Sequence, residues 1–280
     1  MGHISRRRRI STNAEGSGWG NAAFAVVIIV VLYLLVTGAA GKWVAEYVIN
    51  PVYNAFFSTD ESNVEDPVSE SIELESPAAY FIQLGEYDKQ KDAEDQAALI
   101  RPRGAAGYIY RDKNTYRVFA WCYDNEADAK EVKQRLEEQE NMDSIIYKTP
   151  KKSIKLKLSG RKGDVKAVRN SIVKYQSQLV ALKSIIIKLD KGEMGLEGAK
   201  GELNRILTLV SDIAASIDSI YKKTNNECIE KLSKLYASFV QNLSKLSELE
   251  MQNVNECTYR VKYLYMEMYF GRLATMSELK

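Results

Sequence analysis

The feature that most constrains the fold is a short pattern that occurs twice in the middle of the chain. Residues 80–100 align with residues 116–136 without a gap, and the strand-like part of each copy ends in a Tyr-Asp pair, Tyr87-Asp88 and Tyr123-Asp124. Alternating apolar residues at the start of each copy predict a strand, and apolar residues at helical spacing predict a helix after it. Further strand candidates follow at residues 106–110 and 144–148. The sequence therefore predicts two successive strand-helix-strand units.

Two such units favour an α+β fold of βαββαβ order with a four-stranded antiparallel sheet, in which the first and third strands lie in the centre. Both helices are expected on one face, which leaves the other face open. Strand alternation places Phe81, Gln83, Arg117 and Phe119 on that open face. Aromatic rings beside an amide and a guanidinium suit a ligand with flat apolar faces and hydroxyl edges, such as sugar rings, or else stacked bases.

The region after the repeat predicts an all-α bundle at residues 164–275. Apolar residues recur there in alternating steps of three and four, which is the pattern of packed helices with near-parallel axes. Short connections near residues 192–201 and 222–227 favour three or four antiparallel helices. Residues 150–163 are rich in lysine and read as a basic linker between the repeat, at residues 78–149, and this bundle.

The N-terminal region predicts a membrane anchor. Residues 22–40 carry no charge and would span about 28 Å as a helix, enough to cross a bilayer. The arginines at positions 6–9 precede this run, which orients residues 1–20 to the cytoplasm and the later domains to the outside. A cleaved signal peptide is the alternative. We expect a transmembrane helix at 21–41, an apolar juxtamembrane segment at 42–57 and an acidic, disordered linker at 58–77.

The composition argues against common catalytic centres. The one histidine, His3, lies in the N-terminal tail, and the three cysteines are far apart without a CxxC pair. His-ligated zinc sites and Ser–His or Cys–His catalytic pairs are therefore not expected in the folded part. We expect no enzyme activity, no metal and no cofactor.

The segments "YFIQLGEYDKQKDAEDQAALI" and "YRVFAWCYDNEADAKEVKQRL" resemble the SPOR domain, a family of bacterial peptidoglycan-binding modules. The residues that stand at the places of the family pattern are Tyr80, Gln83, Gly85, Tyr87, Ala93, Tyr116, Arg117, Val118, Tyr123 and Ala129. The resemblance implies a non-catalytic module that binds denuded glycan strands, those without stem peptides, with Gln83 and Arg117 in the glycan groove. Two residues depart from the pattern. Glu86 adds a negative charge near the site, and Trp121 would add a stacking surface if strand alternation persists that far.

These inferences predict a membrane-anchored glycan-binding protein of the division or sporulation septum, whose bundle contacts a septal or divisome partner. The layout is similar to that of proteins acting at the sporulation septum of firmicute bacteria. One alternative is a nucleic-acid-binding module of the RRM type, but the third strand lacks the glycine of that motif and no nucleic acid is expected. The other is a structural coiled-coil scaffold whose sheet face is covered by the helices that follow.

Overall fold

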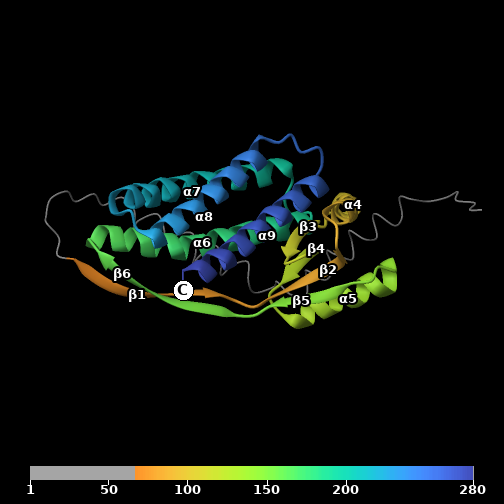
Figure 1. The fold of residues 1–280 in the computed structure, drawn as a ribbon. Helices are drawn as coiled ribbons and strands as arrows, with labels where there is room; N and C mark the ends of the chain where they lie inside the picture. Colours follow the sequence, from red (N-terminus) through yellow and green to blue (C-terminus); the bar gives the residue numbers. More distant parts are fainter. Residues whose placement is uncertain (1–66, 280) are drawn as a thin grey trace, which may run out of the picture.

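The computed structural model describes residues 67–279 (Figure 1). The segments predicted at 1–20, 21–41 and 42–57, and most of the one at 58–77, lie outside the described residues. Among residues 67–279, no helix has both the length and the apolar character needed to cross a membrane.

The duplicated pattern forms the βαββαβ sheet that the sequence predicts. Its strands are β2 (Ala79–Tyr87), β3 (Tyr108–Asp112), β4 (Thr115–Tyr123) and β5 (Ile145–Thr149), in the spatial order β3-β4-β2-β5 with antiparallel neighbours. The two central strands are therefore the first and third of the repeat, as predicted. Helices α4 (Gln90–Ile100) and α5 (Glu126–Glu140) both contact these central strands, and the short 3-10 helix η2 (Arg101–Arg103) follows α4.

A small core forms beneath α4. Ala93, Ala97 and Ile100 of the helix pack on Val118 of β4, and all four are at most 2% exposed. Val118 lies between Arg117 and Phe119 in the sequence, so the alternation that places those two on the open face places Val118 on the helix-covered face. That assignment is confirmed at this position.

The C-terminal region consists of four long helices with short connections. They are α6 (Lys162–Asp190), α7 (Leu196–Thr224), α8 (Glu227–Glu248) and α9 (Val254–Glu278), and successive helices run antiparallel (Figure 1). The predicted seams are buried, with Leu182, Ile217 and Leu243 all fully enclosed. Between α7 and α8, Asn225 adopts a left-handed backbone and Asn226 caps α8 through its side chain.

The two segments predicted as linkers pair with each other instead. β1 (Val68–Ser76) and β6 (Lys152–Gly160) form an antiparallel ribbon in register from Val68 opposite Gly160 to Ser76 opposite Lys152. The prediction of a disordered linker at 58–77 is wrong over β1, and that of a basic linker at 150–163 is wrong over β6. The two segments pair because their charges are complementary and their apolar residues alternate with polar ones. Glu73, for example, faces Lys155 across the ribbon.

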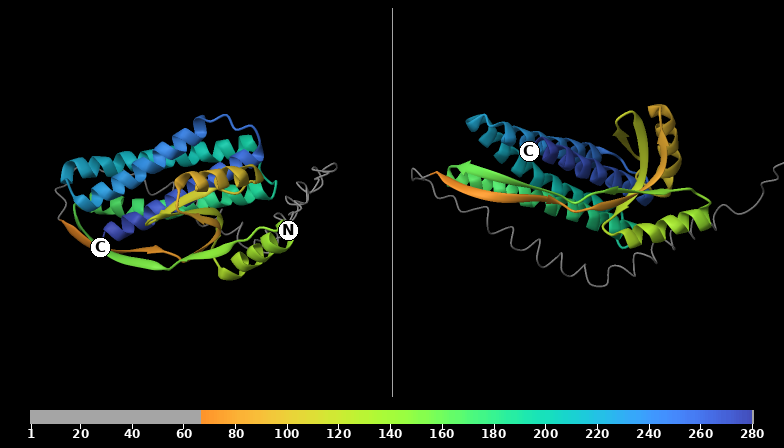
Figure 2. Two further views of the ribbon diagram at one scale, coloured as in Figure 1. Left: turned by 45° about the vertical axis from the view of Figure 1, so that its right-hand side comes forward. Right: turned by 60° about the horizontal axis from the view of Figure 1, so that its bottom comes forward.

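The ribbon extends the sheet along the bundle. Only two residues separate β1 from β2, and two separate β5 from β6. Ile72, Leu74 and Ile154 turn inward and join the core of the bundle, and both strands contact α6 (Figure 2). The sheet and the bundle thus share one continuous hydrophobic core rather than forming two separate bodies.

Candidate functional site

The strand register brings twelve side-chain positions onto the sheet face that the sequence predicts to be open. On β4, Phe119 lies opposite Gln83 of β2 and Tyr108 of β3. One step along, Arg117 lies opposite Glu86 of β2 and Tyr110 of β3. The β5 edge adds a tyrosine opposite Phe81 and an isoleucine opposite Gln83. The full face comprises Phe81, Gln83, Glu86, Tyr108, Tyr110, Asp112, Thr115, Arg117, Phe119, Ile145, Tyr147 and Thr149.

Helix α9 covers one half of this face. Phe81 and Phe119 are 0% exposed. The ring centroid of Phe270 on α9 lies 4.9 Å from that of Phe81 and 5.9 Å from that of Phe119. The hydroxyl of Tyr269 lies 2.7 Å from Oγ1 of Thr149 and donates to the carbonyl oxygen of Pro77 at 3.2 Å. The prediction of an open face is therefore wrong for this half, and the alternative of a cover by the following helices is confirmed there.

The physical reason for the cover is the apolar content of both surfaces. Exposed Phe81 and Phe119 would leave two large rings in water, and α9 carries more aromatic residues than one helix seam can bury. Phe270 stacks on Tyr108 and Tyr110 as well, with centroids 5.6 Å and 4.4 Å apart. The aromatic residues of the sheet face and those of α9 therefore bury each other.

Trp121 also lies inside the structure rather than on a ligand-accessible surface. The register between β2 and β4 shifts between Ile82 and Gln83, so that Trp121 pairs with Ile82 and one residue of β4 is skipped. This bulge interrupts the alternation. Trp121 is 8% exposed and packs against Tyr265 of α9 at 5.2 Å between ring centroids. An extra stacking surface at Trp121 is therefore not present.

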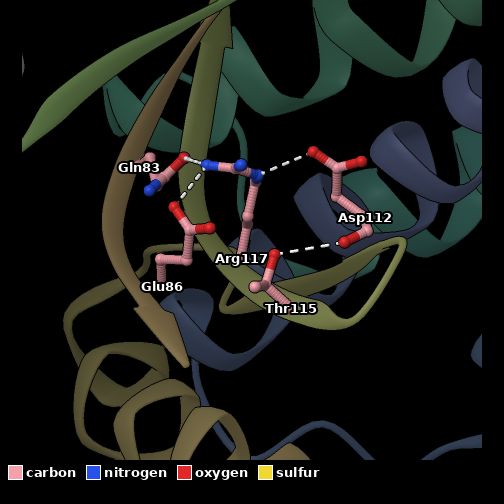
Figure 3. Close-up of polar contacts among 5 residues, drawn as sticks. All are labelled: Gln83, Glu86, Asp112, Thr115 and Arg117. Atoms are coloured by element: carbon pink, nitrogen blue, oxygen red, sulfur yellow. Dashed lines mark hydrogen bonds and ion pairs between the residues drawn. The ribbon is translucent and has the colours of Figure 1, made fainter. Parts of the chain in front are cut away.

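The other half of the face remains accessible and centres on Arg117 (Figure 3). Its Nε donates to Oδ2 of Asp112 at 3.1 Å, and its Nη1 donates to Oε1 of Gln83 at 3.1 Å and to Oε2 of Glu86 at 2.6 Å. The side chains of Arg117, Asp112 and Glu86 are 20%, 30% and 40% exposed. Gln83 is only 3% exposed and serves as a buried support for the guanidinium.

Aromatic rings flank this charged group. The guanidinium carbon of Arg117 lies 5.3 Å from the ring centroid of Tyr147, within the range of a cation–π contact. Tyr110 and Tyr147 are both partly exposed, and their centroids are 6.2 Å apart. Burial raises the pKa of both phenols, so both remain neutral hydroxyl donors at physiological pH. At the β5 edge, Ile145 is 62% exposed.

We call this half, together with its buried support Gln83, the polar strip, and it comprises Gln83, Glu86, Tyr110, Asp112, Arg117 and Tyr147. Of the predicted site residues, the strip brings together Gln83, Arg117 and Glu86, and it excludes the buried aromatics. Sequence reasoning missed Tyr110, Asp112 and Tyr147. The signal that could have found them is the alternation within the two edge strands, which places all three on the face of Arg117.

The strip has the chemical groups needed to bind a polyhydroxyl ligand. Across residues 67–279, no group of three or more His, Cys, Asp and Glu side chains is placed to hold a metal ion. The carboxylates, the amide, the guanidinium and the phenols offer both donors and acceptors on a rigid sheet. Such a surface can hydrogen-bond a polyhydroxyl ligand and stack against its apolar faces.

Comparison with known proteins agrees with the geometry. The family model described as "SPOR domain" matches residues 76–148. No curated protein and no solved structure matches the chain. SPOR domains are non-catalytic modules, and the family implies binding to peptidoglycan. The matched residues comprise the four-stranded sheet except Thr149, the last residue of β5, together with both helices of the sheet and the whole polar strip. Residues 76–148 of this chain are a SPOR domain.

Proposed function

We propose that this protein binds the glycan strands of peptidoglycan through the polar strip. The observation that carries the proposal is the coincidence of the SPOR match with the half of the sheet face that α9 leaves accessible. Within the matched residues, Arg117 and its two carboxylate partners form a partly exposed polar group beside two tyrosine rings. A glycan strand laid along the strip would meet both kinds of contact.

The chemistry of the strip fits a sugar chain. Pyranose rings have an apolar C–H face that packs on phenol rings such as those of Tyr110 and Tyr147. The carboxylates of Glu86 and Asp112 accept from sugar hydroxyls, and hydrogen bonds to charged groups are stronger than neutral ones. Because the buried Gln83 and Phe119 hold Arg117 and Tyr147 in place, few side chains need to be ordered on binding.

The finer role follows from the family resemblance and from the N-terminal sequence. We infer a preference for denuded strands, a single membrane anchor at residues 21–41 and domains outside the cell. The site of action would be a division or sporulation septum, and the layout is similar to that of stage II sporulation protein B. The bundle would meet a septal or divisome partner, with α7 and α8 farthest from the ribbon (Figure 2).

A structural role for the sheet is the second candidate, because half of its face packs on α9. Nucleic-acid binding has less support. The central aromatics that would stack on bases are buried, and the strip holds two carboxylates for one guanidinium. Phosphates would be repelled by that charge balance.

The test is co-sedimentation of the full chain, solubilised in detergent, with peptidoglycan treated or not treated with amidase to remove stem peptides. We expect stronger sedimentation with treated material. Arg117→Ala together with Gln83→Ala should weaken it at least about tenfold, the loss of several hydrogen bonds to charged groups. Arg111→Ala is the control, because Arg111 is exposed on the neighbouring strand and faces the other way, over Tyr116.

Two results would separate the candidates. If the double variant sediments as the wild type does, the polar strip is not the glycan-binding site. No sedimentation of the wild-type chain with either material would favour the structural role of the sheet.

A further inference from the structure

The charge of Arg117 is more than compensated within the polar strip. Its guanidinium donates to two different carboxylates, those of Glu86 and Asp112, and to the amide oxygen of Gln83. Three of its five N–H groups are committed in this way. The guanidinium therefore has little capacity left for an anionic ligand, and the strip as a whole carries one surplus negative charge.

The position of that negative charge is accessible to a ligand. Glu86 is the most exposed member of the ion-pair group at 40%, against 20% for Arg117. Each carboxylate has lone pairs beyond the single bond that it accepts from Arg117. A ligand that reaches the strip therefore meets acceptors before it meets the guanidinium.

The aromatic rings have the same preference for positive charge. The face of a phenol ring attracts cations through its quadrupole, and Tyr147 already lies under the guanidinium of Arg117 at 5.3 Å. Tyr110 lies next to Tyr147 and is also partly exposed. Carboxylates and rings together favour a ligand that is flat, rich in hydroxyls and cationic.

We propose that the strip prefers glycan strands in which glucosamine units carry a free amine instead of the N-acetyl group, and that Glu86 sets this preference. The inference rests on the proposed glycan binding and adds a chemical class to it. A protonated amino sugar places an ammonium group where Glu86 and the ring of Tyr147 can both contact it, while the rest of the sugar binds as a neutral one does.

The magnitude follows from the two contacts. A partly exposed ion pair and a cation–π contact together favour the amino sugar by roughly fivefold to tenfold. Because the chain as a whole has a net charge of +2, general attraction to the protein does not favour a cationic ligand. The preference should weaken at high salt, since the carboxylates are partly exposed to screening ions.

The experiment is calorimetric titration of the full chain with two glucosamine tetramers, one fully N-acetylated and one fully deacetylated. A pH of about 6 keeps an ordinary amine protonated. The wild-type chain should bind the deacetylated tetramer fivefold to tenfold more tightly, and Glu86→Gln, which keeps the size of the side chain, should reduce this preference to about twofold.

A matched control is Glu137→Gln on α5, a carboxylate that is also ion-paired, with Lys133, and similarly exposed. This variant should keep the full preference. Asp112→Asn combined with Glu86→Gln should abolish it.

The following outcomes overturn the inference about amino sugars. Equal binding of both tetramers to the wild-type chain, or a preference that the Glu86→Gln and Asp112→Asn double variant retains, overturns the inference while leaving glycan binding intact. Binding of neither tetramer, with sedimentation also absent, overturns the inference together with the proposed function.

Discussion

Phe270 of α9 packs on several rings of the covered half of the sheet face, and replacing it tests whether that cover is an integral part of the fold. Its ring is 8% exposed and packs on Phe81, Tyr110 and Phe119, with centroids 4.4–5.9 Å away. Phe270→Ala removes this ring and leaves a cavity between α9 and the sheet. A buried Phe→Ala change costs about 3–5 kcal/mol of unfolding free energy.

The contacts place Phe270→Ala within that range. Aromatic pairs contribute about 0.5–1.5 kcal/mol each beyond area burial, and Phe270 makes several at once. Because the ring of Phe270 keeps 8% exposure, the expected loss of unfolding free energy lies in the lower part of that range, at about 3–4 kcal/mol. A domain is typically stable by about 5–15 kcal/mol, so the variant should still fold but unfold at clearly lower urea.

The assay is urea unfolding followed by circular dichroism, with native-state hydrogen exchange to locate the effect. Phe239→Ala is the control, because Phe239 is also buried but packs against Tyr175 inside the bundle. Phe270→Ala should speed exchange in β2 and β4 beyond the global loss, and the control should not. A loss below about 1 kcal/mol, or exchange in the two strands that stays at the wild-type rate, would refute the integral cover.

Three further changes test other parts of the fold. Leu74→Ala should lower the unfolding free energy by about 2–4 kcal/mol and Glu73→Ala by at most about 0.5, measured by urea unfolding, and equal effects would mean that β1 is not packed. Lys262→Met should cost about 3–5 kcal/mol, because it leaves the buried carboxylate of Asp190 without its ion-pair partner; full stability of the variant would contradict this. Burial raises the pKa of the Cys122 thiol from 9.0 to about 12, so its contribution to stability is complete below about pH 9 and declines as the pH rises toward 12. Between about pH 8 and pH 10 the unfolding free energy, measured by urea unfolding, should fall by about 1 kcal/mol more in the wild type than in Cys122→Ala, and parallel declines would count against it.

Much of the fold could be predicted because its signals are local. The repeat fixes the order of strands and helices, and the heptad spacing fixes the buried side of each long helix. Ile186 and Val210 are buried where the spacing places them. Such patterns depend only on the period of each element and need no knowledge of what the element packs against.

The covered half of the sheet face and the ribbon could not be predicted in the same way. Alternation correctly placed Phe81 and Phe119 on one face but did not say whether water or α9 would meet them. β1 carries three glutamates and β6 three lysines, and each strand alone resembles a solvated linker. Their complementarity appears only when the acidic strand is set against the basic one, across more than seventy residues of sequence.

The cover on one half of the sheet face bears on the function proposed for the other half. Phe270 packs on Phe119, Phe119 packs on Tyr147 at 5.3 Å, and Tyr147 lies under the guanidinium of Arg117. A row of contacting side chains therefore runs from the bundle to the centre of the polar strip. Because the buried rings hold Tyr147 in place, the docked helix preorganises the site rather than blocking it. If Phe270→Ala remains folded but binds glycans more weakly than the wild type, glycan binding depends on the docked helix. Binding at the wild-type level in the folded variant would mean that the strip is held by its own strands alone.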